Sequence, residues 1–66
     1  MFYHFFLEGE NIDGDLIVEF FEVETTNEIE ALAMAKKVAI AILEDENGGH
    51  IDIFNEDGIF VVDVEI

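Results

Sequence analysis

The stretch T-T-N-E-I-E-A-L-A-M-A-K-K-V-A-I-A-I-L-E-D-E, residues 25–46, decides the fold, because it is the long helical segment of an otherwise strand-like chain. Its beginning is typical of a helix start. Asn27 can cap the helix with Glu30 three residues on, or Thr25 can do so with Glu28. The acidic side chains of this first turn also suit the positive end of the helix dipole.

The other end of this stretch predicts where the helix stops. We expect the helix to run to about Glu46, where the run Asn47-Gly48-Gly49 ends it. The acids at positions 44–46 lie at the negative end of the dipole, which is a small local cost in stability.

Strand-like segments lie on both sides of the helix. They cover residues 2–7, 16–24, 50–54 and 59–66, and the run N-E-D-G at 55–58 is typical of a hairpin turn. The order is therefore β-β-α-β-β. We expect an α+β fold over residues 1–66 as a single domain, with one antiparallel four-stranded sheet and one helix packed across it.

Apolar residues predict which side of each strand is buried. The alternation of the second strand slips at two adjacent phenylalanines, and a bulge there would bring its apolar residues to one side. The last strand offers one apolar face. The apolar residues of the second strand are Leu16, Val18, Phe20, Phe21 and Val23. The apolar face of the last strand consists of Phe60, Val62, Val64 and Ile66.

The helix carries more apolar surface than one sheet can cover. At about 100° per residue, one stripe holds Ala31, Met34, Ala35, Val38 and Ile42. Roughly opposite lie Ile29, Leu32, Ile40 and Leu43. Loops or sheet edges could wrap this second side, but a short chain has little left for that. We therefore expect a homodimer formed through the second side.

Composition is dominated by negative charge. The 66 residues include 17 acids against two basic residues, Lys36 and Lys37, for a net charge of −15 and a pI near 4.1. A hydrophobic fraction of 52% argues against a disordered acidic tail. With so few cations, the chain is not expected to bind nucleic acid or anionic membranes directly. The absence of cysteine and of a basic signal region predicts a cytoplasmic location.

The octet E-G-E-N-I-D-G-D, residues 8–15, could be read as a calcium loop. Aligned on Gly14, however, the loop would begin at Gly9 and end at Phe20, so the first and last ligands are missing. The chain has no serine or cysteine, and neither His4 nor His50 has such a nucleophile to activate. We expect no enzyme activity, no metal site and no cofactor.

The acids taken together suggest a different role. Residues i and i+2 of a strand lie about 6.6 Å apart, which is comparable to the spacing of phosphates along a nucleic-acid strand. Two pairs have this spacing, Glu22 with Glu24 and Asp63 with Glu65. Such a surface would attract a groove lined by Lys and Arg. The alternative is a solvated surface that confers only solubility. The expected partner-binding acids are Glu8, Glu10, Asp13, Asp15, Glu22, Glu24, Glu44, Asp45, Glu46, Glu56 and Asp57.

In size, charge and element order the chain resembles small, cysteine-free, phage-encoded inhibitors that imitate DNA, of the anti-CRISPR and anti-restriction type. This resemblance implies a non-enzymatic inhibitor that occupies the DNA-binding channel of a bacterial defence effector. Its location would then be the bacterial host cytoplasm.

Two runs, Y-H-F-F-L at 3–7 and N-E-D-G at 55–58, carry a second resemblance. It is to a family of small bacterial proteins of unknown function with a Y-F-F-H-L-like start, an Ala-rich helix and a closing strand pair around D-E-D-G. Helices of that family are rich in Arg, whereas this one has Lys36 and Lys37. The resemblance implies the same element order and no activity. Small antitoxin domains share a partial β-β-α arrangement, so the alternative function is a dimeric protein-interaction module without mimicry.

Overall fold

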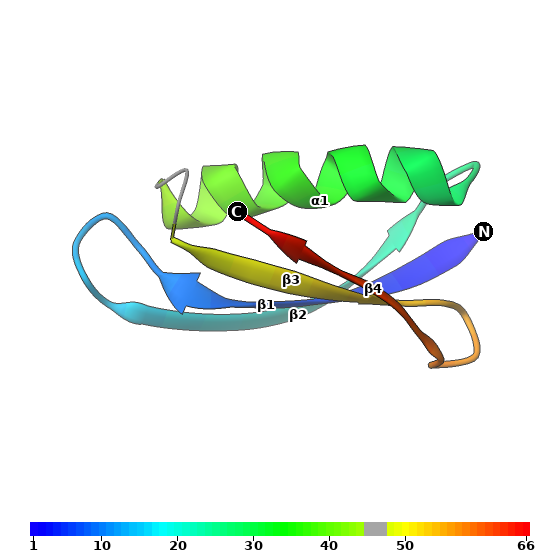
Figure 1. Ribbon diagram of the computed structural model, residues 1–66, viewed down its shortest axis with the longest axis horizontal. Coiled ribbons are helices and arrows are strands. Elements are labelled where there is room, and N and C mark those ends of the chain that lie inside the picture. Colours follow the sequence, from blue (N-terminus) through cyan, green and yellow to red (C-terminus); the bar gives the residue numbers. More distant parts are fainter. Residues whose placement is uncertain (45–47) are drawn as a thin grey trace.

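The computed structural model describes residues 1–44 and 48–66, which form two layers, a helix over one face of an antiparallel sheet (Figure 1). The sheet has the strand order β2-β1-β3-β4, so two hairpins are joined by the pairing of β1 with β3. This arrangement confirms the predicted β-β-α-β-β order and the α+β fold. The elements are β1 (Phe2–Glu10), β2 (Leu16–Glu24), α1 (Glu28–Leu43), β3 (Gly49–Phe54) and β4 (Phe60–Glu65).

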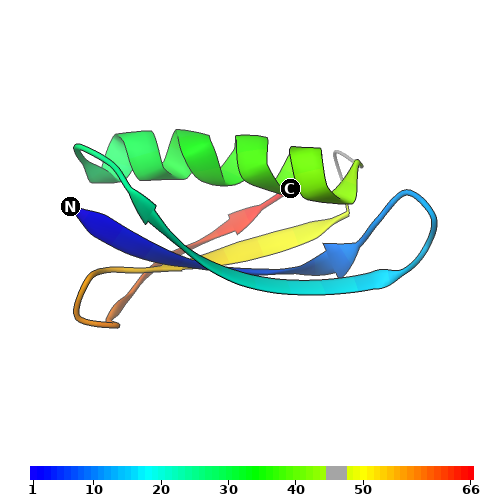
Figure 2. The same ribbon diagram turned by 180° about the vertical axis from the view of Figure 1, so that it is seen from behind.

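The two hairpin turns lie at opposite ends of the sheet, as the views from both sides show (Figures 1 and 2). The β1–β2 turn lies beside the C-terminal end of α1, where the backbone N–H of Ile12 donates to the carbonyl oxygen of Leu43 at 2.9 Å. This bond satisfies a carbonyl that has no partner within the helix. The β3–β4 turn lies at the other end of the molecule.

The helix begins with Asn27 as its N-cap, which is the first of the two predicted caps. The side-chain oxygen of Asn27 accepts from the backbone N–H of Glu30 at 2.9 Å, and the Glu30 carboxylate accepts from the Thr26 hydroxyl at 2.8 Å. The helix ends at Leu43, so the predicted end near Glu46 is wrong. Glu44 adopts the left-handed conformation (φ 57°) and thereby breaks the helical path. Residues 45–47 lie outside the described residues.

The core lies between α1 and the sheet. Alternate residues of β1 point toward the helix and are almost fully buried, because successive side chains of a strand point to opposite faces. The helix contributes every fourth residue, mostly alanine, which allows it to lie close to the large side chains of the sheet. The core residues are Tyr3, Phe5, Leu7, Ala31, Ala35, Ala39, Leu43, Ile51, Ile53 and Val64.

Two predictions about the sheet faces are wrong. The pairing of β1 with β2 is continuous from Phe2 with Glu24 to Glu10 with Leu16, so no bulge is present at Phe20-Phe21. Leu16, Val18 and Phe20 therefore lie on the face away from the helix, while Phe21 and Val23 pack against the core.

The irregularity lies instead in the other hairpin. Ile53 pairs with Val62, but Phe54 pairs with Phe60, so Val61 is the extra residue of a bulge. This bulge turns Phe60 to the open face, and the prediction that Phe60 shares a face with Val62 and Val64 is wrong.

The two predicted sides of the helix also need correction. Leu43 is 0% exposed and belongs to the core, and Leu32 packs against the core in part. Among the predicted outer residues, Ile29 and Ile40 are exposed. The sheet-facing side is rotated from the prediction because small alanines, and not the bulkiest residues, make the closest approach. Within the described residues, no helix is long and apolar enough to cross a membrane.

Candidate binding surface

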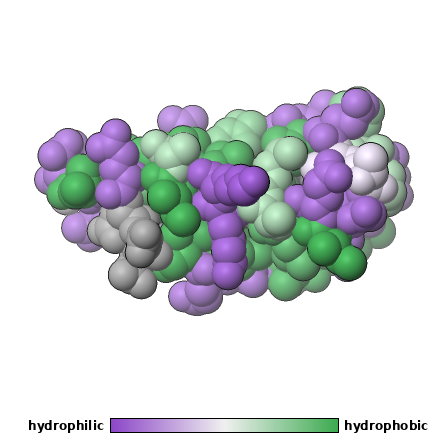
Figure 3. Space-filling view, turned by 90° about the horizontal axis from the view of Figure 1, so that it is seen from above, coloured by the Kyte–Doolittle hydropathy of each residue, from purple (hydrophilic) through white to green (hydrophobic). Residues whose placement is uncertain are grey.

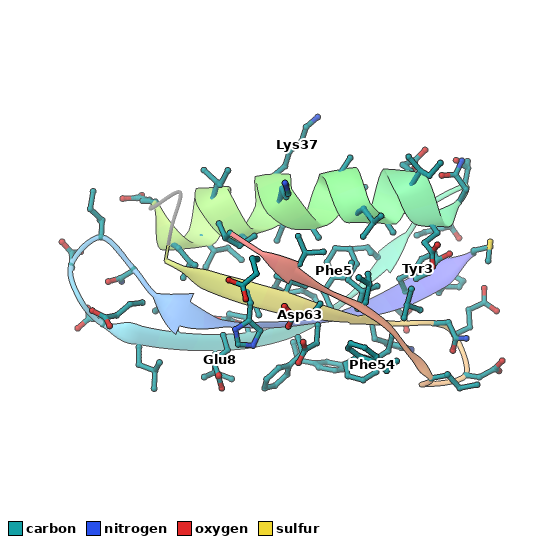
Figure 4. The ribbon with its side chains drawn as sticks, in the orientation of Figure 1. Tyr3, Phe5, Glu8, Lys37, Phe54 and Asp63 are labelled. Carbon is teal, nitrogen blue, oxygen red and sulfur yellow. The ribbon has the colours of Figure 1, made fainter. Side chains whose placement is uncertain are left out.

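The described carboxylates lie almost entirely at the surface. Fifteen of the seventeen acids fall in the described residues, and fourteen of these are exposed; the exception, Asp52, is half-buried. Within that part of the chain, neither lysine forms an ion pair, and the one close approach of a basic side chain to a carboxylate is that of His4 Nδ1 to Glu22 Oε2 at 3.8 Å. Both lysines lie on α1 and are exposed, and Lys37 points away from the sheet (Figure 4). The negative surface is therefore not neutralised from within this part of the molecule.

The octet at 8–15 forms the end of β1 and a hairpin turn. The side-chain oxygen of Asn11 accepts from the backbone N–H groups of Asp13 at 3.0 Å and Asp15 at 2.9 Å. Gly14 takes the positive φ (84°) that the turn requires. The Asn11 oxygen that a calcium loop would use is thus engaged by the turn itself.

The second turn has the same sequence pattern, N-x-D-G, and the same bonds. The side-chain oxygen of Asn55 accepts from Asp57 N at 2.9 Å and from Ile59 N at 3.0 Å, and Gly58 has φ 79°. The carboxylate of Glu56 accepts from the backbone N–H of Phe2 at 2.9 Å. The two turns hold predicted site residues at opposite ends of the sheet, Asp13 and Asp15 at one end and Glu56 and Asp57 at the other.

The face of the sheet away from the helix, called the open face here, combines acids with aromatic rings. Strand pairing assigns its residues, because cross-strand partners point to the same side. Phe54 and Glu8 lie on this side, whereas Tyr3 and Phe5 lie between helix and sheet (Figure 4). The acids of the open face are Glu8, Glu10, Glu22, Glu24, Asp52, Asp63 and Glu65; its aromatic residues are Phe2, His4, Phe6, Phe20, Phe54, Phe60 and, beside the acids, His50.

The rings of the open face contact one another. His4 stacks on Phe20 with ring centroids 5.9 Å apart, and Phe6 lies 6.4 Å from Phe20. Phe54 and Phe60 meet edge to face at 5.8 Å. Phe20 is 62% exposed and Phe60 55% exposed. Large apolar side chains gathered in the open are typical of an interaction surface.

Two aspartates face each other across β3 and β4. A side-chain hydrogen bond with Asp63, together with burial and the Asp63 charge, raises the pKa of Asp52 above its ordinary value of 3.8. The charge of Glu8 acts in the same direction and that of His50 opposes it. The Asp52–Asp63 pair therefore brings two carboxylates together at the β4 edge of the open face, midway along the strands.

His50 joins this pair to form a set of potential metal ligands. One nitrogen of His50 and one oxygen each of Asp52 and Asp63 lie within 4.8 Å of one another. Imidazole and carboxylate together are donors that suit first-row transition metals. The three groups lie on a surface rich in acids, and exposed acidic groups commonly lie this close together without binding a metal, so we assign no metal to them.

The outer side of α1 holds the exposed part of the predicted dimer face. Ile29 is 78% exposed, and Ile40 is exposed one turn after the lysines. Seen from above the helix, apolar groups alternate with hydrophilic ones (Figure 3). A shallow hollow of about 190 Å³ lies beside this side, lined by Lys36, Ile40, Glu65 and Ile66. This volume is below the range of typical ligand pockets.

The structure brings together residues that the predicted site did not contain. Of the predicted acids, Glu8, Glu10, Glu22 and Glu24 lie on the open face, and Glu44 lies at the end of α1. Asp45 and Glu46 lie outside the described residues. Asp52, Asp63 and Glu65 are the acids added on the open face, with Phe20 and Phe60. The strand spacing of Asp63 and Glu65 was recognised in the sequence, although the two were not placed in the predicted site. Asp52 was missed, and the period-two alternation of β3 was the signal that could have found it.

Comparison with known proteins gives no match among protein-family models, curated proteins or solved structures.

Proposed function

We propose that this protein is a non-enzymatic acidic binding protein that occupies the basic, nucleic-acid-binding surface of another protein, in the manner of a DNA mimic. The partner class is a Lys- and Arg-rich effector of bacterial defence. In this role the protein itself binds neither nucleic acid nor membrane.

The observation that carries the proposal is the set of exposed carboxylates that neither lysine neutralises in the part of the chain that the structure describes. Within the described residues, fourteen carboxylates are exposed and neither lysine forms an ion pair. The sheet and its two hydrogen-bonded turns hold many of them on defined backbone. A scaffold that fixes anionic groups in this way presents a regular negative surface, as the phosphates of a nucleic acid do.

The physical consequence is binding that is fast and sensitive to salt. Carboxylates attract a basic groove over a distance set by the ionic strength, about 8 Å at physiological salt. At contact, each carboxylate can accept two hydrogen bonds from an arginine, as a phosphate does. Binding to a groove that normally holds DNA then excludes the DNA by occupying the same cations.

The test is capture followed by displacement. Immobilised protein is incubated with bacterial lysate at low salt, and bound proteins are eluted by a salt gradient. Each recovered protein that binds nucleic acid is loaded with a labelled DNA duplex, and the acidic protein is added. We expect release of the DNA, with an affinity that falls roughly tenfold or more between about 50 and 200 mM salt.

The control is a variant whose charge is reduced without a change of shape. Glu8, Glu10, Glu22 and Glu24 are replaced by glutamine, and circular dichroism confirms that the sheet remains. This variant should lose the partner at a much lower salt concentration. A variant that keeps every partner, or a recovered partner that keeps its DNA when the protein binds, contradicts the proposal.

A second candidate function is a dimeric interaction module of the antitoxin type, without mimicry. The exposed isoleucines of α1, Ile29 and Ile40, favour it, because an apolar helix side can pair with its copy. This function predicts a dimer by light scattering, dissociated by Ile29→Lys, and rescue of growth when the protein is expressed with a neighbouring toxin. A monomer at high concentration contradicts it.

A further inference from the structure

The open face orders its aromatic and acidic groups along a diagonal. Strand pairing gives one row of Phe20, Phe6, Asp52 and Asp63 across the sheet, from β2 to β4. The next row is Glu22, His4, Phe54 and Phe60. The rings thus run from Phe20 on one edge strand, past His4, to Phe60 on the other, with carboxylates at both flanks.

This diagonal band is most open to solvent at its two ends, whereas His4, Phe6 and Phe54 between them are half-buried. Its two ends, Phe20 and Phe60, are more than half exposed, although both rings touch other rings of the band. At one flank, Glu22 and Glu24 lie on β2; at the other, Asp52 and Asp63 lie opposite each other on β3 and β4. The rings of the band therefore lie on the same face of the sheet as these carboxylates, which flank the band on both sides.

One side chain fits both parts of this surface. The planar guanidinium of arginine stacks flat on an aromatic ring, while the N–H groups at its edge donate to carboxylates in pairs. The lysine ammonium is a compact, strongly hydrated charge that makes neither contact as well. A band of rings with acids at its flanks therefore discriminates between the two cations.

Charge complementarity decides between the possible occupants. A second copy placed face to face would bring seven carboxylates of one open face against seven of the other, and both lysines of the chain lie on α1. Like charges without intervening cations oppose such a dimer. A cationic segment meets no such opposition.

We infer that the open face is an arginine-binding surface, which takes a partner segment carrying two or more arginines along the ring diagonal. This inference rests on the proposed function and deepens it, since it names the face that meets the basic partner and the side chain it prefers. The guanidinium groups stack on the band ended by Phe20 and Phe60. They donate to the flanking carboxylates of Glu22 and Asp63.

The experiment compares arginine and lysine peptides of equal length and charge. A fluorescent peptide of six arginines, or of six lysines, is titrated with the protein at moderate salt. The wild type should bind the arginine peptide roughly tenfold more tightly, from two stacked guanidinium groups. The double variant Phe20→Ala/Phe60→Ala should bind both peptides equally, with the salt dependence for the lysine peptide unchanged.

Further measurements show whether a loss of arginine preference comes from lost stacking and not from a change in the fold. Ile29→Ala, on the exposed side of α1, should leave the arginine preference intact. Because Phe20 and Phe60 are more than half exposed, the double variant should keep the wild-type circular dichroism spectrum. In carbon-13 spectra of the wild type, the arginine peptide should shift the ring signals of Phe20 and leave those of buried Phe5 in place.

The outcomes distinguish the inference from the proposed function. Tight, salt-sensitive binding with equal affinity for both peptides overturns the arginine surface and leaves the proposed function standing. So does an arginine preference that survives the double variant. Binding of neither peptide at about 50 mM salt overturns both. A dimer that the double variant abolishes would show that the occupant is a second copy, which also overturns the inference.

Discussion

The two faces of the sheet are built from the same strands and from similar residues, but one face is buried under α1 and the other is exposed. On β1, Tyr3, Phe5 and Leu7 point toward the helix and are nearly or fully buried. The neighbouring residues His4 and Phe6 point to the open face, where they meet Phe20. Apolar character alone therefore does not mark the core. The position of α1 decides which rings are buried and which remain available to a partner.

The strongest test of this difference between the faces is to remove one aromatic ring from each face and compare the losses in stability. Phe5→Ala deletes a fully buried ring and should cost about 3–5 kcal/mol, enough to unfold a domain of this size. Phe20→Ala removes a ring that is 62% exposed and should cost well under half of that. Urea denaturation followed by circular dichroism measures the cost of Phe20→Ala, and loss of the folded spectrum without urea, or a much lower urea midpoint, reports the larger cost of Phe5→Ala. Equal costs would show that the open face is a second core.

The sequence predicts those parts of this arrangement that depend on residues close together in the chain. Asn27 and Glu30 mark the helix start because a cap depends on residues three apart. The two N-x-D-G turns are readable for the same reason, since their bonds lie within five residues. The element order followed from such local patterns.

The faces depend on distant partners, which the sequence does not state. Phe20 and Phe21 were expected to share a side, but the unbroken pairing with β1 sends them to opposite sides. The bulge at Val61 similarly moves Phe60 to the open face. The Asp52–Asp63 pair requires the same hairpin register. The ring band and its acidic flanks are therefore products of strand register that no single segment encodes.

The close approach of β1 and β3 offers a second way to destabilise the face of the sheet that α1 covers. Gly9 and Gly49 are cross-strand partners, and a Cβ added at Gly9 would lie 2.5 Å from the Gly48 carbonyl oxygen and 2.8 Å from Gly49 Cα. Backbone atoms cannot move aside as a side chain does. Gly9→Ala should cost about 1–3 kcal/mol, measured by the shift of the urea midpoint.

A glycine in the exposed turn is the control for that substitution. Gly14 has φ 84° and faces open space apart from the Glu10 carboxylate, 3.8 Å from an added Cβ. Asparagine tolerates this left-handed conformation, so Gly14→Asn should cost less than Gly9→Ala. The reverse order would contradict the close approach of β1 and β3.

Salt should sharpen the difference between the faces, because the open face carries seven carboxylates and no lysine. Cations in solution screen their mutual repulsion, so the melting temperature should rise by several degrees between about 20 mM and 1 M NaCl. The quadruple variant with glutamine at Glu8, Glu10, Glu22 and Glu24 should show a smaller rise. A melting temperature that does not respond to salt would contradict crowding of these charges.

The smallest expected effect concerns the facing aspartates at the β4 edge of the open face. Asp63→Asn removes one charge and offers Asp52 an amide N–H donor that an ionised carboxylate lacks, so it should stabilise the protein at pH 7 by about 0.2–1 kcal/mol. The raised pKa of Asp52 means that the folded state holds this proton more tightly than the unfolded state. The resulting stability is fully present below pH 3.8, the ordinary value, and is lost as the pH rises through the raised pKa.

The advantage of Asp63→Asn should therefore shrink as the pH falls toward 4, where protonation already relieves the pair in the wild type. Urea titrations of both proteins at several pH values between about 4 and 7 measure this difference. Asp13→Asn, which removes one charge at the hairpin end, is the charge-matched control and should show a smaller dependence on pH. An advantage of Asp63→Asn that is constant across this range would mean that the folded pair takes up no extra proton, so that both aspartates stay ionised, and would contradict the raised pKa of Asp52.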